Sequence, residues 1–321
     1  MRILRFFAAL LLLCGTTRAA QAQSDQPDLN DAAFLLPTTE DTSLLWRISD
    51  GSDGVASYLY GTIHIIPEKD YFMPPTVVRA INDVDEVLFE IDPRDMQNPA
   101  VMMTMMDKIM MRNDTSLEDL LTEARFDSVA NYFNDRGMPF MFFQRMKPMF
   151  LSAMVGQDMS NGNPFAGGGE DGSGAKSYEF ELSQIADAGG KEIGGLETMD
   201  FQLGLFDSIP YTVQADMLYQ TVADDMAAEL ADGDSQMDQM IALYKRRAVA
   251  EMAQLITSES EGFGNFEDLL VVRRNEKWVS EIADRLATPS MYAVGAGHLG
   301  GERGVIALLR AEGYTVEPVY E

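Results

Sequence analysis

The chain has very few of the residues that form common nucleophile and metal sites. Its 321 residues include one cysteine, Cys14, and two histidines, His64 and His298. Cys14 falls within a predicted signal peptide, so the mature chain is expected to have no thiol. This excludes disulfides, cysteine catalysis and thiolate metal sites. Any metal would have to be held by histidine, carboxylate, amide or water.

Positive charge is also scarce. The sequence has 24 Lys and Arg against 51 Asp and Glu, which gives a formal charge of −27 at pH 7. Such a surface repels the phosphates of nucleic acids and anionic lipids, so we expect no nucleic-acid partner. Solubility alone accounts for an acidic surface, so the charge says little about mechanism.

Long apolar runs are confined to the N-terminus. Two arginines precede the apolar run from Phe6 to Cys14, and Ala20-Gln-Ala22 fits signal peptidase. We interpret residues 1–22 as a signal peptide and expect an exported protein, periplasmic or secreted. A lipoprotein signal is the alternative, but Cys14 follows three leucines rather than a small residue. After cleavage we expect no integral membrane segment.

The rest of the chain predicts one α/β domain. Residues 23–42 are polar and acidic without periodicity, which indicates a flexible leader. Residues 43–321 are expected to form a mixed central sheet with surrounding helices. Within them, 100–160 is a methionine-rich helical insertion over the site, and 160–176 is a glycine-rich loop. Methionines that fill an apolar core or lid are favoured over a copper site.

Apolar periodicity predicts the individual elements. Strands are expected at 44–49 and 56–66, which form a hairpin, and at 86–91, 191–197, 290–295 and 314–319. Helical patterns cover 180–188, 214–259, 266–286 and 302–312.

Both histidines end a strand-like run in the pattern Gly-x-x-His. The two copies are Gly61-Thr-Ile-His64 and Gly295-Ala-Gly-His298. A glycine lets the backbone turn at a strand end, and open α/β sheets bind ligands at such edges. Two unrelated core histidines are the alternative, but the repeated pattern favours one shared site.

Two other strand-like runs end in acid, at Glu90 and Glu197. Two imidazoles with one or two carboxylates suit a divalent metal, which could activate water or polarise a carbonyl. A carboxylate outside the coordination shell would take the proton of the water. Arg274 would neutralise a tetrahedral intermediate or bind a substrate carboxylate. The alternatives are solvated glutamates and a surface ion pair of Arg274.

The second histidine motif also fits a dinucleotide-binding fingerprint. Gly295-Ala-Gly-His-Leu-Gly300 follows a predicted strand, and Glu317 lies near the distance of a ribose-binding acid. The chain ends soon afterwards, whereas a nucleotide-binding domain continues through several strands. The fingerprint also leaves His64 unexplained, so a metal site is favoured.

Five motifs in order resemble the TraB/GumN family, which is related to the Tiki metalloproteases. They are Tyr58-Leu-Tyr-Gly-Thr-Ile-His64, Phe89-Glu90-Ile-Asp92, Gly195-Leu-Glu-Thr198, Arg274-Asn275-Glu-Lys-Trp278 and Val294-Gly-Ala-Gly-His-Leu-Gly-Gly301. Their spacing matches from about Leu45 to Val319. One departure is Ala231-Asp-Gly-Asp234, where bacterial relatives often have Trp before Gly-Asp.

The resemblance implies an erythromycin-esterase/ChaN-like fold and a site made of residues far apart in the sequence. Its motifs map onto His64, His298, Glu90, Arg274 and Asn275. Glu197 falls in the Leu-Glu-Thr motif, and Glu179 lies where the family often has Asp. Tiki-like relatives cleave peptides with a divalent metal, TraB-like relatives limit a peptide pheromone, and GumN is associated with exopolysaccharide gene clusters.

Residues and resemblance together predict an exported metal-dependent hydrolase, a peptidase that uses Mn, Co or Zn on a peptide or other small extracytoplasmic substrate. The expected metal ligands are His64, His298, Glu90 and Glu197. The expected catalytic residues are Glu90, Arg274 and Asn275, and the expected substrate contacts are Gly61, Thr62, Gly295, Gly297 and Glu179. The alternative is a non-catalytic periplasmic protein that captures a peptide, haem or a polysaccharide precursor in the same cleft.

Overall fold

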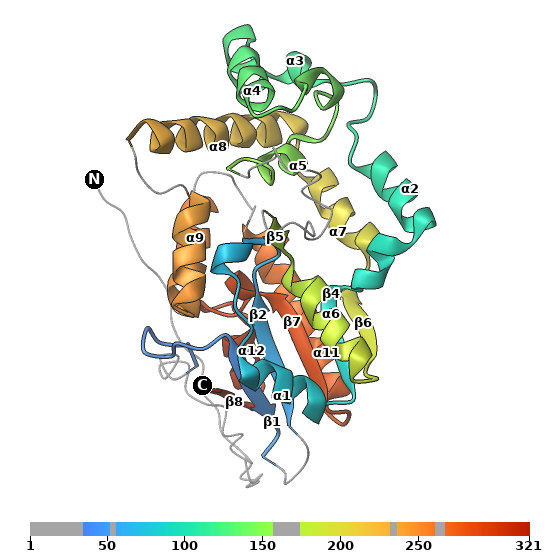
Figure 1. Cartoon of the computed structure of the whole chain (residues 1–321), viewed down its shortest axis with the longest axis vertical. Helices are drawn as coiled ribbons and strands as arrows, with labels where there is room; N and C mark the ends of the chain where they lie inside the picture. Colours follow the sequence, from blue (N-terminus) through green and yellow to red (C-terminus); the bar gives the residue numbers. More distant parts are fainter. Residues whose placement is uncertain (1–34, 52–55, 157–173, 232–235, 261–266) are drawn as a thin grey trace, which may run out of the picture. The chain divides into compact units, whose positions relative to one another are not determined.

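The structure is a computed structural model that describes residues 35–51, 56–156, 174–231, 236–260 and 267–321 (Figure 1). Phe34–Glu321 form one compact unit. The predicted signal peptide, the leader up to residue 34 and the glycine-rich loop up to residue 173 lie outside the described residues. The end of the predicted leader contacts the domain, because the Leu35 carbonyl accepts a hydrogen bond from Arg310 at 3.0 Å.

A mixed sheet lies at the centre of the described fold. Its six strands are β1 (Leu45–Ser49), β2 (Ser57–Thr62), β4 (Glu86–Ile91), β6 (Glu192–Glu197), β7 (Ser290–Gly295) and β8 (Thr315–Pro318), in the order β6-β4-β7-β2-β1-β8. Strands β6, β4, β7 and β2 are parallel, and β1 is antiparallel to both of its neighbours. The predicted α/β class with a mixed sheet is confirmed.

The pairing of β2 with β7 places the two Gly-x-x-His motifs side by side. Gly61 is opposite Val294, and Thr62 is opposite Gly295. The two strands are parallel, so both turns leave the sheet at the same edge. At β7 the chain continues into the short 3₁₀ turn η7 (Ala296–His298).

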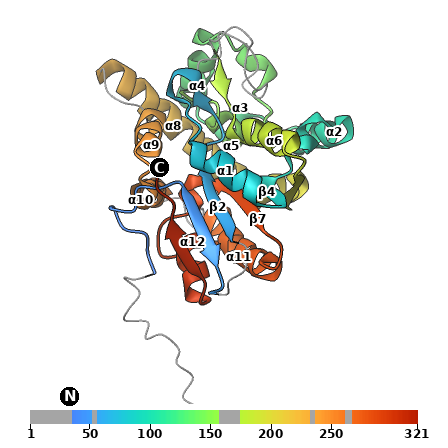
Figure 2. The same ribbon diagram turned by 60° about the horizontal axis from the view of Figure 1, so that its bottom comes forward.

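Helices cover both faces of the sheet, so the central strands β4 and β7 are buried along nearly their whole length. The helices are α1 (Pro75–Asp83), α2 (Pro99–Lys108), α3 (Leu117–Leu120), α4 (Glu123–Asp135), α5 (Pro148–Ser152), α6 (Tyr178–Ala188), α7 (Met199–Leu205), α8 (Tyr211–Ala231), α9 (Gln236–Lys245), α10 (Val249–Ser260), α11 (Arg273–Arg285) and α12 (Val305–Ala311). Helices α1 and α6 lie on one face, and α11 and α12 lie on the other (Figure 2). Among the described residues, no helix is both long and apolar enough to span a membrane.

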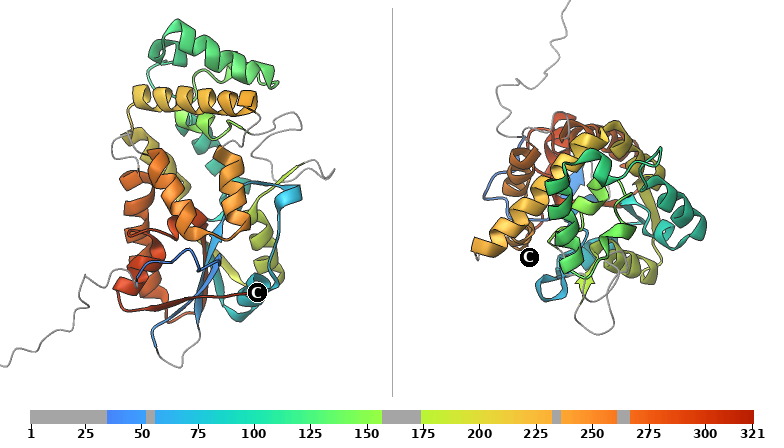
Figure 3. Two further views of the ribbon diagram at one scale, coloured as in Figure 1. Left: turned by 90° about the vertical axis from the view of Figure 1, so that its left-hand side faces the viewer. Right: turned by 90° about the horizontal axis from the view of Figure 1, so that it is seen from above.

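The methionine-rich insertion forms a second apolar core with helices from outside it. Helix α8 runs alongside α4 and α5 (Figure 3), and contributes Ala215, Leu218 and Val222 to this core. Among the described residues of the insertion, the buried methionines are Met105, Met111, Met138, Met146 and Met154. Methionine therefore fills a core here, as its flexible side chain allows.

Several predicted boundaries differ from the structure for local reasons. The predicted helix 214–259 is divided, and before α10 the backbone of Arg247 has a φ of +58°, which an α-helix does not tolerate. The predicted helix 266–286 starts with a π-helical turn, η6 (Asp268–Val272). The end of the predicted glycine-rich loop forms the short strand β5 (Ala175–Lys176), which pairs with β3 (Ile66–Pro67).

Candidate functional site

The candidate site lies at the carboxyl edge of the four parallel strands (Figure 1). Strand β6 ends at Glu197, and β4 carries Glu90 one residue before its end. Strands β2 and β7 lead into the turns of His64 and His298. Neighbouring strands are separated by only about 4.8 Å, so side chains from adjacent strand ends come into contact.

His298 is a largely buried imidazole with a hydrogen-bond partner at each ring nitrogen. Its Nδ1 lies 2.7 Å from Oδ1 of Asn275, its Nε2 lies 3.2 Å from Nη1 of Arg274, and its ring centroid is 4.6 Å from that of Trp278. Burial lowers the pKa of His298 to about 3 with the help of the Arg274 charge, although Glu90 acts in the opposite direction. The ring is therefore neutral at physiological pH.

Asn275 determines which nitrogen of His298 carries the proton. The Asn275 Nδ2 donates to the backbone oxygen of Arg303 at 2.8 Å, so Oδ1 is the atom that faces the imidazole. An amide oxygen only accepts, so Nδ1 of His298 must donate and Nε2 keeps its lone pair. Arg274 and Asn275 begin the buried side of α11, which continues through Trp278.

His64 has a different environment at the end of the neighbouring strand. Its side chain is 65% exposed, and its Nδ1 lies 2.9 Å from Oε1 of Glu179, at the start of α6. The hydroxyls of Thr62 and Ser177 also donate to Glu179, at 2.8 Å and 3.1 Å. These bonds orient the Glu179 carboxylate towards Nδ1 and leave Nε2 as the outer nitrogen of the ring.

The charges of His64 and Glu179 stabilise each other. The Glu179 carboxylate raises the pKa of His64, an effect that water screens in part because the ring is mostly exposed. Burial raises the pKa of Glu179, but His64 and the hydrogen bonds to the carboxylate outweigh it and leave that pKa lowered. The charges of Glu90 and Arg274 also act on His64, and that of His64 acts on His298, so both histidines belong to one electrostatic site.

Glu90 and Glu197 share the guanidinium group of Arg274. Nη2 lies 2.5 Å from Oε2 of Glu90, and Nε donates to Oε2 of Glu197 at 3.0 Å. The other oxygen of Glu90 accepts from the backbone amide of Gly295 at 2.8 Å. Burial acts to raise the pKa of Glu90, but the charge of Arg274 and the hydrogen bond from the Gly295 amide act in the opposite direction, and the pKa lies well below its usual value. Glu90 is therefore an ionised carboxylate.

Gln202 is a site residue that the sequence did not reveal. Its Nε2 donates to Oε2 of Glu90 at 3.0 Å and to Oε2 of Glu197 at 3.1 Å. Thr198 caps α7 by accepting from the backbone amide of Phe201 at 3.2 Å, so the helix starts directly after β6. Gln202 follows in the first turn of α7, which places its side chain back at the end of β6. The sequence feature that could have indicated Gln202 is Thr198, a helix-capping residue directly after the acidic end of β6.

The donor types of the site fit a divalent metal, but Arg274 determines how they are arranged. Each histidine has its Nδ1 bound by an acid or an amide, as metal-binding histidines commonly do. Arg274 contacts Glu90, Glu197 and Nε2 of His298, three of the four expected ligands. In the described part of the chain, no three His, Cys, Asp or Glu side chains are grouped closely enough to bind one ion. Oε1 of Glu197 is buried without a hydrogen-bond partner.

Two predicted substrate-contact glycines are needed for close packing. A Cβ on Gly61 would lie 3.0 Å from the Cβ of Ala296, so the glycine lets β2 approach the His298 turn. A Cβ on Gly297 would overlap Ile256 of α10. Thr62 contacts Glu179, as described above. Contact of these residues with a substrate stays a prediction.

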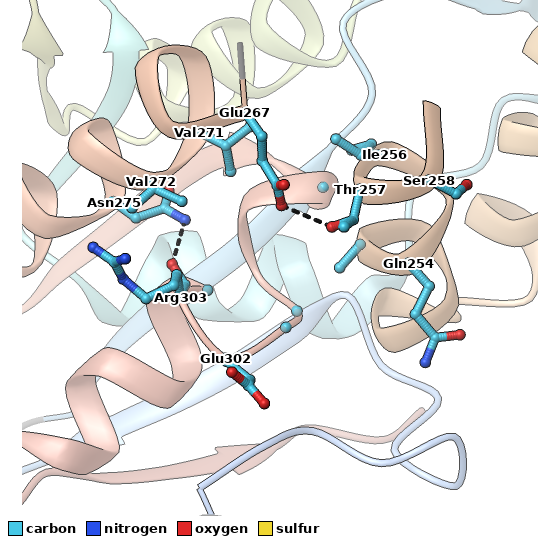
Figure 4. Close-up of a pocket in the computed structure, with 15 residues that line it drawn as sticks. Gln254, Ile256, Thr257, Ser258, Glu267, Val271, Val272, Asn275, Glu302 and Arg303 are labelled. Carbon is cyan, nitrogen blue, oxygen red and sulfur yellow. Dashed lines mark hydrogen bonds between the residues drawn. The ribbon is translucent and has the colours of Figure 1, made fainter. Parts of the chain in front are cut away.

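A cavity of about 400 Å³ lies between α10, the start of α11 and the glycine-rich turn after His298 (Figure 4). Its apolar wall includes Ile256, Val271 and Val272. At the edge of the cavity, the Thr257 hydroxyl donates a hydrogen bond of 2.7 Å to Glu267. Asn275 lines the cavity and also contacts Nδ1 of His298, so the cavity adjoins the histidine site.

Comparisons with known proteins identify the family of this chain. The model of the TraB/PrgY/gumN family matches residues 44–318. Metalloprotease TIKI2 of Danio rerio is 21% identical over an alignment 358 residues long, which covers 96% of this chain and 67% of the relative. Metalloprotease TIKI1 of Danio rerio is 21% identical over an alignment 360 residues long, which covers 97% of this chain and 70% of the relative. No solved structure matches the chain. The chain belongs to the TraB/PrgY/gumN family.

Proposed function

We propose that this protein is a peptide hydrolase that uses a divalent metal at the carboxyl edge of its parallel strands. One observation carries the proposal: two histidines from adjacent strands are each oriented through Nδ1, His64 by Glu179 and His298 by Asn275. Both are thereby prepared to use Nε2, at the strand edge that also carries the ionised Glu90. The similarity to two metalloproteases supports the same chemistry.

The proposed roles follow from these contacts. His64, His298 and Glu90 would hold Mn, Co or Zn, and the bound ion would lower the pKa of a water molecule and polarise the peptide carbonyl. Arg274 would neutralise negative charge that develops on the substrate. Asn275 keeps His298 in the tautomer with an unprotonated Nε2.

Glu197 is better suited to positioning than to binding the metal. Its side chain is fully buried, and its Oε2 accepts from Arg274 and from Gln202. These bonds hold the guanidinium group against Glu90. We therefore assign Glu197 to the orientation of Arg274.

A non-catalytic binding protein is the second candidate. Its support is that Arg274 already binds Glu90 and Nε2 of His298, so these expected metal ligands have a partner within the protein. Such a protein would use the same strand edge to capture a peptide, haem or a polysaccharide precursor. It would bind without cleaving.

We also propose that the protein is exported to the periplasm or secreted. The support is the N-terminal sequence, with two arginines, an apolar run and Ala20-Gln-Ala22. N-terminal sequencing of protein recovered from the periplasm or the medium tests this. A mature chain that starts near Gln23 is expected, and an intact Met1 in the cytoplasm would contradict it.

Hydrolysis of a peptide library by chelated protein, with and without added Mn, Co or Zn, tests the enzyme proposal. Glu90→Gln should lower kcat/KM at least about 100-fold, because removal of a catalytic or metal-bound carboxylate has effects of this order. Glu192→Gln is the matched control, since Glu192 is exposed at the opposite end of β6. Peptide binding without cleavage under every metal condition would favour the binding protein.

A further inference from the structure

Glu90 and Glu197 form a buried pair of carboxylates that needs a cation. Their side chains are 9% and 0% exposed, and Gln202 Nε2 donates to both of them, at 3.0 Å and 3.1 Å. Two carboxylates this close together and shielded from water can both be ionised only beside a positive charge. In this structure Arg274 is that charge.

Every nitrogen of the Arg274 guanidinium is bound within the site. Nε donates to Glu197 and Nη2 to Glu90, while Nη1 donates to the Leu270 carbonyl at 3.1 Å and to Nε2 of His298. The guanidinium carbon also lies 4.6 Å from the Trp278 ring centroid. Arg274 therefore holds Oε2 of Glu90 and Nε2 of His298 at the same time.

Those two atoms are the ones that a divalent ion would need. The other oxygen of Glu90 accepts from the Gly295 amide, and Nδ1 of His298 is bound to Asn275. A guanidinium group and a metal ion cannot occupy the same lone pairs. The two cations must therefore compete for this part of the site.

We propose that Arg274 is an internal counter-cation, which a divalent ion must displace from Glu90 and His298 in order to bind. This deepens the proposed metal-dependent function and rests on it. Arg274 offsets part of the negative charge of the two carboxylates while the metal is absent, and its withdrawal frees the guanidinium when the ion arrives. The π-helical turn η6 lies directly before α11 and supplies the Leu270 carbonyl, so the backbone is irregular at the point where Arg274 would move.

Competition makes a clear prediction for zinc affinity. Titration calorimetry at pH 7.5 with Zn²⁺ alone would compare chelated wild type with Arg274→Gln, Arg274→Lys and Arg273→Gln. Removal of a competing cation should strengthen zinc binding at least about 10-fold in Arg274→Gln, within the usual range of coupling between sites. Arg274→Lys should lie between Arg274→Gln and wild type. Arg273→Gln should match wild type, because Arg273 pairs with Asp268 outside the site.

A spectroscopic measurement on wild type does not depend on how the variants fold. Zn²⁺ should shift the fluorescence of Trp278 as the Arg274 guanidinium leaves its ring. The midpoint of this shift should agree with the zinc affinity measured by calorimetry. Trp46, the chain's other tryptophan, lies on β1 and should be unaffected. Unchanged or weaker zinc affinity in Arg274→Gln, or zinc binding with no fluorescence change, overturns the displacement alone. No zinc binding by wild type overturns the metal proposal itself.

Discussion

The two Gly-x-x-His turns leave adjacent strands at the same edge of the sheet, yet their imidazoles lie in opposite environments. His298 is almost enclosed, faces an amide, and has a lowered pKa, whereas His64 is largely exposed, faces a carboxylate, and has a raised one. The pattern sets where each ring is placed. Its charge depends on partners from other parts of the chain, Glu179 from α6 and Asn275 from α11.

The difference shows how one site can hold both protonation states of imidazole at neutral pH. A neutral ring can offer a lone pair to a metal, whereas a protonated ring must first lose its proton. We expect His298 to bind the ion without losing a proton and His64 to exchange a proton for the ion.

The largest expected difference between the two turns is in stability without metal. His298→Ala should lower the free energy of unfolding by about 2–4 kcal/mol, because it leaves a cavity beside Trp278 and removes a partner of Asn275. His64→Ala should change it by less than about 0.5 kcal/mol, since an exposed side chain fills no core. Urea unfolding of chelated protein measures both. Equal losses would mean that the two rings share one environment.

A smaller effect is expected from the groups that orient the rings. Glu179→Gln and Asn275→Ala should each weaken zinc binding about 10- to 100-fold, as loss of a partner behind a ligating histidine usually does. Titration calorimetry measures the affinities. Glu181→Gln is the matched control on α6, because Glu181 pairs with Lys176 instead of a histidine. If it weakened binding as much as Glu179→Gln, general charge rather than orientation would be responsible.

The smallest effects are two opposite pH dependences of stability in the chelated protein. His298 has a lowered pKa, so its contribution is complete above about pH 6.5 and is lost as the pH falls towards about 3. His64 has a raised pKa, so its contribution is complete below about pH 6.5 and is lost as the pH rises.

Unfolding free energies of wild type, His298→Gln and His64→Gln across this range measure these slopes. Between pH 6.5 and 5, before Glu90 and Glu179 titrate, His298 should contribute up to about 1.4 kcal/mol per pH unit. In His298→Gln the free energy of unfolding should depend less on pH between 6.5 and 5. The alkaline branch of His64 should be shallower, because water screens its pairing with Glu179. A wild-type curve that His298→Gln leaves unchanged would refute the neutral assignment.

Sequence patterns predicted most strands of the sheet, because the parallel strands are short apolar runs that end at glycine or polar residues. The signal peptide stays a prediction, since residues 1–22 lie outside the described residues. The helix boundaries were less accurate where a single backbone conformation decided them, as at Arg247. Propensity and periodicity do not specify such a turn.

The sequence by itself determined which side chains stand at strand ends, because an apolar run that ends in glycine or acid shows where a strand leaves the sheet. Only the tertiary structure decided what these side chains touch. Arg274 bonds to Glu90 across 184 positions of sequence, and His64 to Glu179 across 115. Strand order and helix packing bring such partners together, and burial then sets their charge. The same Gly-x-x-His pattern therefore produced a neutral ring in one turn and favoured a protonated ring in the other.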